Sequence, residues 1–250
     1  MSSNSNETLW DASHRPWPLP KLPWVMRQDW HHVLFIHYPI RVETLRKLVP
    51  ANLQLDIYEG WGWIGIVPFY TAEVRLRGIP WATAFPEVNV RTYITINGKP
   101  GVYFFSLDAT HLPTVLFAST FCFVPYYHAK IEFQNKEQHS CRFISKRRIH
   151  ESVIQLDCSY SPIPKAKPSR AEKGSFDEWL TERYGFFTTT SKGTILRCDL
   201  LHQPWQLQRV KAEIHANTLL SEQGIDVEQV DPVLHYSQGA SVRIWPLLKE

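Results

Sequence analysis

Cysteine is scarce and widely spaced in this chain of 250 residues. The four cysteines form no C-x-x-C pair and have no paired histidines beside them, which argues against a zinc site. A chain of this length can bury a sizeable core without disulfide bonds. We therefore expect reduced, mostly buried thiols, and the sequence predicts neither a metal nor an organic cofactor. The cysteines are Cys122, Cys141, Cys158 and Cys198.

The chain also lacks a large excess of charge of one sign and a long run of apolar residues. The 27 basic and 24 acidic residues leave a net charge of +3, too small to predict binding to nucleic acid. The longest apolar stretches, such as residues 115–125, are shorter than the ~20 residues of a membrane-spanning helix. Residues 1–6 are polar and lack the apolar core of a signal peptide. The sequence therefore predicts a soluble, cytoplasmic protein that binds no nucleic acid and no membrane.

The motifs of several common enzyme classes are absent as well. The chain has no G-x-S-x-G elbow, no P-loop, no G-x-G-x-x-G and no H-E-x-x-H. His31 and His37 would share one face of a strand, but six residues separate them by ~20 Å, too far to share a metal. Aromatic residues, in contrast, are plentiful, with ten Trp, ten Tyr and thirteen Phe. This content fits a large strand-built core or a cavity lined by rings.

Proline divides the chain into two parts. Four prolines within residues 1–26 exclude regular structure there, so we expect a flexible Pro/Trp-rich strap laid over the body. Residues 27–250 show no repeat and no linker and are expected to form a single domain. Ser175 and Glu178 form a capping box that opens a helix to residue 184, and Gly224 ends a helix at 217–223.

Short alternating segments dominate this domain, which predicts a mainly β (α+β) fold with a few short helices. Residues 42–49 are expected to form a helix; residues 113–122 fit a helix or a strand, and we expect a short helix. Strands are expected at 29–38, 53–58, 62–77, 127–134, 140–150, 152–160, 186–190, 194–201, 206–215, 233–236 and 240–245.

The strongest local signal is a hairpin, in which residues 85–96 and 99–108 alternate in character on either side of Asn97-Gly98. On its first strand one face is polar. A two-residue loop pairs Ile96 with Lys99 and sets the remaining partners, whereas a three-residue loop would break the grouping. The polar face holds Glu87, Asn89, Arg91, Tyr93 and Thr95. The expected cross-strand pairs are Arg91 with Phe104, Asn89 with Ser106, and Glu87 with Asp108.

This polar face must look onto either water or a polar cavity. An exposed face would carry a solvated ion pair that adds only about 0–1 kcal/mol. We favour a cavity, because the neighbouring side chains, such as Phe85 and Phe104, are apolar and ligand pockets are apolar with a few convergent polar groups. Within such a cavity burial would raise the pKa of Glu87 and Arg91 would lower it, and the sequence leaves the outcome open.

Three further segments contain residues that could take part in a site. Tyr126, Tyr127 and His128 follow a proline, with Lys130 just beyond; one of the two tyrosines is expected to pack in the core. Arg183, near the end of the capped helix, is interpreted as a surface residue that complements the helix dipole. The segment 202–205 is interpreted as a buried turn anchored by Trp205.

Taken together, these motifs resemble the YqjF-like family of bacterial proteins of unknown function. The resemblance extends over residues 30–245 and is carried by FIHYP at 35–39, LVP at 48–50, FPEVNVRTY at 85–93, GVYFFSLD at 101–108, PYYHA at 125–129, LTERY at 180–184 and HQPWQL at 202–207. That family is similar in fold to acetoacetate decarboxylase. The resemblance therefore implies an antiparallel, cone-shaped β-barrel with an interior site.

The resemblance also implies which chemistry is lost. In the decarboxylase a Pro-Lys-Lys element supplies a lysine that forms a Schiff base. The matching element here is Pro125-Tyr126-Tyr127, and Lys130 lies four residues past the matched nucleophile. The decarboxylase's site glutamate matches Glu87, whereas its site arginine has no clean match, since Pro39 stands there. A pocket without imine chemistry is implied.

Three functions remain open. The first is an enzyme that acts on a small carbonyl or carboxylate compound, with Glu87 as acid or base and Tyr126 as donor to a developing oxyanion. The second is a non-catalytic binding or sensor protein that uses the same cavity for a small-molecule ligand. The third is a structural subunit that self-associates, and a homo-oligomer is possible in each case. The expected ligand-binding residues are Asn89, Arg91, Tyr93, Phe104, Ser106, Asp108, Tyr127 and His128.

Overall fold

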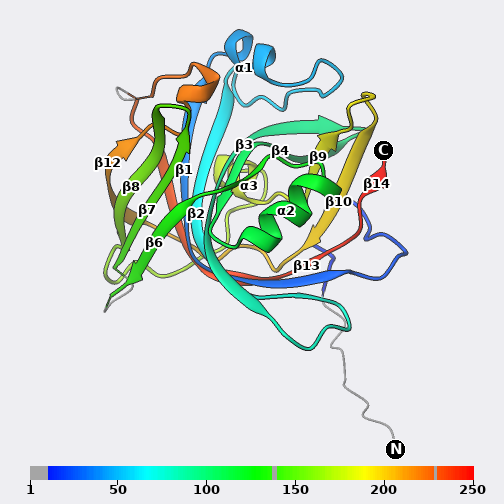
Figure 1. Cartoon of the computed structure of the whole chain (residues 1–250), viewed down its shortest axis with the longest axis horizontal. Coiled ribbons are helices and arrows are strands. Elements are labelled where there is room, and N and C mark those ends of the chain that lie inside the picture. Colours follow the sequence, from blue (N-terminus) through cyan, green and yellow to red (C-terminus); the bar gives the residue numbers. More distant parts are fainter. Residues whose placement is uncertain (1–10, 137–139, 228–229) are drawn as a thin grey trace, which may run out of the picture.

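Two β-sheets form the body of the protein, whose structure is a computed structural model that describes residues 11–136, 140–227 and 230–250. The first sheet runs β11-β13-β1-β2-β3-β4-β9-β10-β14, and β10 also pairs with β13, which closes the strands from β13 to β10 into a ring. The second sheet, β12-β8-β7-β6, packs against one side of this ring (Figure 1).

The ring sheet is made of β1 (Met26–Ile40), β2 (Gly62–Leu76), β3 (Thr83–Ile96), β4 (Lys99–Ala109), β9 (Gly185–Thr189), β10 (Ile195–Leu201), β11 (Leu207–Gln208), β13 (Val233–Ile244) and β14 (Leu248–Lys249), with β5 (Tyr126–His128) beside β4. The second sheet contains β6 (Lys130–Asn135), β7 (Cys141–Ile149), β8 (Ser152–Pro162) and β12 (Val210–Asn217). The helices are α1 (Val42–Leu48), α2 (Leu112–Phe121), α3 (Phe176–Thr181) and the 3₁₀ turn η2 (Ser221–Gln223). No helix in these described ranges is long and apolar enough to cross a membrane.

The predicted mainly β fold with short helices is confirmed, with local corrections. Residues 53–58 are not a strand; they make only isolated bridges, such as Leu55 with Ile94. The expected strand 127–134 is divided at Ala129 between two sheets, and 206–215 is divided at Arg209. Two expected C-terminal strands are one strand, β13, and the last predicted helix is only the turn η2, which Gly224 ends at φ +66°. The sheet is antiparallel except that β4 pairs in parallel with β5 and β9.

The first described residues, 11–25, form no helix or strand but lie over the body. Arg15 and Trp17 are buried and both contact Asp199 on β10. Arg15 Nη2 lies 2.7 Å from Asp199 Oδ1, and Trp17 Nε1 donates to the same oxygen at 2.6 Å. The predicted flexible start falls partly on residues 1–10, which lie outside the described residues.

The central parts of β1 to β3 are buried on both faces, and apolar residues occupy most of their positions outside the polar face of β3. On β1, Leu34 and Ile36 pack toward the second sheet in the main core, whereas Val33 and Phe35 point into the ring beside Trp205. The alternation of side chains along each strand thus divides the apolar residues between an outer core and an inner chamber.

The hairpin of β3 and β4 positions the polar face. The predicted register holds from Ile96 opposite Lys99 to Arg91 opposite Phe104. A β-bulge at Phe105 then inserts one residue, so the faces of β4 are reversed beyond it. The predicted pairs Asn89–Ser106 and Glu87–Asp108 are therefore wrong, and the observed partners are Leu107 for Asn89 and Ala109 for Glu87.

Candidate functional site

A cavity of about 440 Å³ lies inside the ring and is lined in part by α2, the helix that lies in front of the ring in Figure 1. Most of its lining is aliphatic or aromatic and comes from β1, β2, β4, β9, β10 and α2. The apolar residues that shape it include Met26, Trp30, Val33, Phe35, Val67, Phe69, Leu76, Val102, Phe104, Leu107, Phe117, Phe121, Phe186, Leu200, Trp205 and Ile244. The chamber therefore has the apolar walls expected of a small-molecule pocket.

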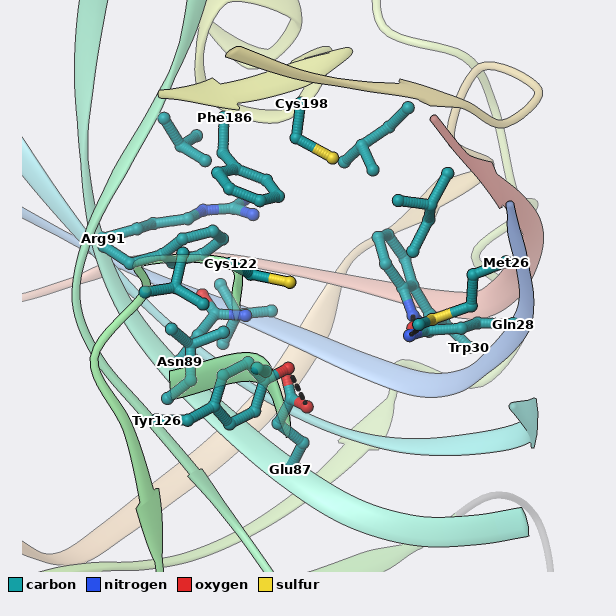
Figure 2. Close-up of a pocket in the computed structure, with 18 of the residues that line it drawn as sticks. Met26, Gln28, Trp30, Glu87, Asn89, Arg91, Cys122, Tyr126, Phe186 and Cys198 are labelled. Carbon is teal, nitrogen blue, oxygen red and sulfur yellow. Dashed lines mark hydrogen bonds between the residues drawn. The ribbon is translucent and has the colours of Figure 1, made fainter. Parts of the chain in front are cut away.

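One wall of this cavity is polar and comes from β3. Glu87, Asn89 and Arg91 all line the cavity, because residues two apart on a strand point to the same side. Figure 2 shows these three side chains along one side of the chamber, with Met26, Gln28 and Trp30 across from them. The sequence-based grouping of these three residues agrees with this placement.

Glu87 is paired with Tyr126 from β5. The Tyr126 hydroxyl donates to Glu87 Oε2 at 2.9 Å, and both side chains line the cavity. The pKa of Glu87 is raised to about 7, chiefly by burial; the Tyr126 hydrogen bond lowers this pKa and the Asp108 charge raises it. Arg91 is four residues away, ~13 Å along the strand, and does not offset this shift. The sequence left open whether burial or Arg91 determines the pKa of Glu87, and in the structure burial does.

Arg91 has no carboxylate partner among the described residues. Its Nε and Nη2 are buried without a hydrogen-bond acceptor there, and its neighbour is the neutral Tyr93 hydroxyl, whose pKa burial raises and the guanidinium lowers. Its Cζ lies 5.7 Å from the centroid of the Phe35 ring. A guanidinium held in an apolar chamber without a partner is costly, so this arrangement favours an anionic ligand.

Arg183 is a second cavity residue that the sequence analysis missed. Its interpretation as a surface residue is wrong, since it is only 5% exposed. Its Nη1 lies 2.6 Å from Asp56 Oδ2, its Nε donates to the Trp179 carbonyl at 2.8 Å, and its Nη2 is buried without a partner in the described ranges. It is buried because α3 is short and β9 enters the ring directly after it.

The predicted ligand residue Phe104 lines the cavity, but Tyr93 does not. Tyr93 shares the face of Arg91 and is fully buried beneath α3, with its ring 4.9 Å from Trp179 and 4.8 Å from Arg183 Cζ. It therefore packs behind the two arginines. Its pKa is raised by burial, against a lowering by Arg91 and Arg183.

Four other predicted ligand residues lie away from the cavity. The bulge turns Ser106 and Asp108 toward the second sheet, where Asp108 Oδ1 lies 3.0 Å from Arg147 Nε. Tyr127 covers the same guanidinium, with its ring centroid 4.0 Å from Arg147 Cζ. His128 is exposed. Burial raises the pKa of Asp108 to about 6, although Arg147 lowers it.

Among the residues that the structure describes, no lysine lines the cavity. Lys130 lies on β6 of the second sheet with 82% of its side chain exposed. Tyr126, which the sequence analysis expects at the nucleophile's position, lines the cavity, and burial, with Glu87, raises its pKa well above 10. The cavity residues therefore supply an acid, a phenol and two guanidinium groups.

Solved structures with this fold include enzymes. The enduracididine biosynthesis enzyme MppR complexed with pyruvate superposes with a TM-score of 0.62 over 92% of this chain and 91% of its own, at 9% identity. An acetoacetate decarboxylase-like enzyme from Sphingomonas wittichii RW1 superposes with a TM-score of 0.61 over 94% and 98%, at 12% identity. These likenesses establish the acetoacetate decarboxylase-like fold and nothing further.

Sequence comparison is more specific. The uncharacterized protein YqjF of Bacillus subtilis (strain 168) is 45% identical over 229 residues, which cover 90% of this chain and 93% of that protein. Residues 27–241 match the family DUF2071, described as an uncharacterized conserved protein. The chain therefore belongs to the DUF2071 family of YqjF-like proteins.

Proposed function

We propose that the protein binds a carboxylate-bearing small molecule inside the ring, with Arg91 holding the carboxylate. The observation that carries this proposal is the buried Arg91 guanidinium, which lacks an acceptor in the described ranges. A planar guanidinium donates two parallel hydrogen bonds to a carboxylate, and these bonds are strong in a dry chamber. The pyruvate in the MppR complex is a carboxylate of this kind and supports the same class of ligand.

Glu87 would act on the bound molecule as a general acid or base. A pKa of about 7 lets it both donate and accept a proton near neutral pH. Tyr126 orients the carboxyl through its hydrogen bond to Oε2. A direct role for Tyr126 toward a developing oxyanion would require its hydroxyl to turn from Glu87 to the ligand.

The experiment is a thermal-shift screen of carboxylates and carbonyl compounds, followed by product analysis of each hit by mass spectrometry. The proposal expects hits among carboxylates, their loss in Arg91→Gln, and a changed product for at least one hit. Full turnover by a Glu87→Gln protein would contradict the acid–base role of this residue.

The chemistry should proceed without an imine, because no lysine lines the cavity. Borohydride added together with acetoacetate should leave the mass of the intact protein unchanged. A stoichiometric reduced adduct, on Lys130 or on any other lysine, would contradict this expectation.

A non-catalytic sensor or carrier is the second candidate. The observation in its favour is Tyr126 at the position matched to the decarboxylase nucleophile. Ligands that bind through Arg91 and are recovered unchanged after long incubation would favour this function over an enzyme.

A further inference from the structure

We infer that the ligand of this cavity is a carboxylate with a long or bulky apolar body, bound head-first, and not a three- or four-carbon keto acid. This inference rests on the proposed function and specifies its substrate class. The carboxylate would lie between Arg91 and Arg183, and the apolar body would extend toward the opening beside α2.

The buried polar atoms of the described cavity lining that lack a partner belong to three residues. Among lining residues in the described ranges, the buried polar atoms without a partner are Asn89 Oδ1, Arg91 Nε and Nη2, and Arg183 Nη2. Buried polar groups are nearly always hydrogen-bonded, so these atoms mark where a polar ligand group is needed. Arg183 Cζ lies 4.8 Å from the centroid of the Tyr93 ring, and Arg91 lowers the pKa of the same tyrosine, so both guanidinium groups neighbour Tyr93.

The charge at this end matches a single anionic group. Arg91 and Arg183 each carry one positive charge, and Asp56 offsets the charge of Arg183 through its 2.6 Å ion pair. Burial, together with Arg91, lowers the pKa of the neighbouring His37 well below 6.5, so this ring stays neutral. One positive charge is therefore left over, which one carboxylate would neutralise.

The opposite wall offers a ligand few free polar atoms. Gln28 and Trp30 line it, but Trp30 Nε1 donates to Gln28 Oε1 at 2.7 Å, and Gln28 Nε2 donates to Met26 Sδ at 3.2 Å. Figure 2 shows this group facing the β3 wall across the chamber. Two further lining groups are engaged, since Cys198 donates to the Trp245 carbonyl and Thr181 Oγ1 donates to the Asp177 carbonyl. An apolar ligand body suits this surface better than a second charged or polar group.

The opening itself is apolar. Leu76, Phe117 and Phe121 line the cavity and are also 44%, 47% and 62% exposed, so they stand where the chamber meets solvent. The rings of Phe117 and Phe121 lie 5.2 Å apart and form one exposed apolar patch, the kind of surface that marks ligand or partner sites. A ligand whose carboxylate reaches the arginines would cover these side chains with the far end of its apolar body.

The size of the chamber also argues against a very small ligand. At about 30 Å³ per water molecule in the liquid, 440 Å³ corresponds to more than ten waters. Pyruvate has only six non-hydrogen atoms and would leave most of the apolar wall uncovered. A carboxylate of eight to ten carbons would fill it.

The test is a calorimetric titration of the full-length protein with butanoate, hexanoate, octanoate and decanoate, with pyruvate and octan-1-ol as comparison ligands. Each added methylene should tighten binding about fourfold while the chain is still entering the chamber. Octan-1-ol should bind at least tenfold more weakly than octanoate, because it lacks the charge that Arg91 and Arg183 require.

Two variants of α2 separate the cavity from general surface hydrophobicity. Phe121→Ala should weaken octanoate binding about tenfold and leave butanoate binding unchanged. Leu116→Ala is the matched control, since Leu116 is 58% exposed on the same helix but does not line the cavity, and it should change neither. Circular dichroism verifies that both variants are folded.

The possible outcomes distinguish this inference from the proposed function. If pyruvate and butanoate bind as tightly as octanoate, the apolar substrate class is wrong and the carboxylate pocket survives. Equal weakening of octanoate binding by both α2 variants would also overturn the inference. If octan-1-ol binds as tightly as octanoate, or if no carboxylate binds, the arginine end has no role and both proposals fail.

Discussion

At the scale of single residues, β3 places two ionisable side chains in a chamber that disfavours charge. Glu87 sits in an apolar chamber that raises its pKa, and Arg91 keeps its charge there without an acceptor in the described ranges. Both arrangements lower the stability of the ligand-free protein. Such destabilising residues are typical of functional sites, where they serve binding or catalysis. Each residue therefore makes a prediction about stability as well as about binding.

Glu87 should make stability fall as the pH rises. Its pKa is about 7 in the folded chain against 4.5 in the unfolded one, so between these values the folded state holds more protons. The stabilisation from the protonated carboxyl is full below pH 4.5 and is lost as the pH rises through 7. The free energy of unfolding of Glu87→Gln minus that of the wild type should grow by about 3 kcal/mol from pH 4 to pH 8. Urea denaturation at each pH measures this difference, and the exposed Glu132→Gln variant is the control. A difference that stays constant with pH would contradict the prediction for Glu87.

In the absence of ligand, Arg91 should lower the free energy of unfolding. Arg91→Gln removes a buried charge that has no ion pair to break, so the free energy of unfolding should rise by about 1 kcal/mol while carboxylate binding is lost. Denaturation with and without octanoate measures both effects. A destabilised Arg91→Gln protein that still binds octanoate would show that the guanidinium has a structural role instead.

At the scale of elements, α3 determines the position of the second arginine. Only one of the two hydrogen bonds of the predicted capping box forms. Ser175 Oγ accepts from the Glu178 backbone N–H at 3.2 Å, as expected. Glu178 Oε2, however, accepts from the Gly174 N–H and not from the Ser175 N–H. This N-terminus fixes a helix of six residues directly before Arg183 and β9.

Loss of this cap should therefore affect stability and binding together. Ser175→Ala should lower the free energy of unfolding by about 1 kcal/mol, because a backbone donor of α3 loses its acceptor. Octanoate affinity should fall slightly as Arg183 becomes less fixed. Urea denaturation and calorimetry measure the two effects, and an unchanged free energy of unfolding would show that this hydrogen bond does not stabilise the helix.

At this scale, local sequence signals could place some residues of the candidate site but not others. Alternation and Asn97-Gly98 were sufficient to place Glu87, Asn89 and Arg91 on one face, because both signals are local. The bulge at Phe105 has no glycine or proline to mark it, so the positions of Ser106 and Asp108 could not be predicted. Arg183 was misjudged for another reason: only the pairing of β9 with β4 and β10, distant in sequence, shows that its helix end is buried.

At the scale of the whole molecule, closure of the ring brings together a site from segments far apart in the sequence. Composition and alternation predicted the class of fold, and the family resemblance predicted the ring with an interior. The second sheet, which buries the outer faces of β1 to β3, was not anticipated as a separate layer. Strand pairing across long sequence separations leaves no local trace, so this layer could come only from the structure.

The strap at residues 11–25 should stabilise this closed ring. Asp199→Ala leaves Arg15 buried without its ion pair, Trp17 without its acceptor and Arg197 with Glu250 as its remaining carboxylate partner, so the free energy of unfolding should fall by about 3 kcal/mol or more. Glu213→Ala, which removes only an exposed partner of Lys211, should have almost no effect. Equal effects of the two substitutions, measured by urea denaturation, would contradict a structural role for the strap.

The most direct measurement is a crystal structure of the protein with octanoate. The account predicts a carboxylate within hydrogen-bond distance of Arg91 and Arg183, with the chain running past Phe104 toward Phe121. A carboxylate that faces solvent at the opening, or octanoate bound outside the ring, would contradict it.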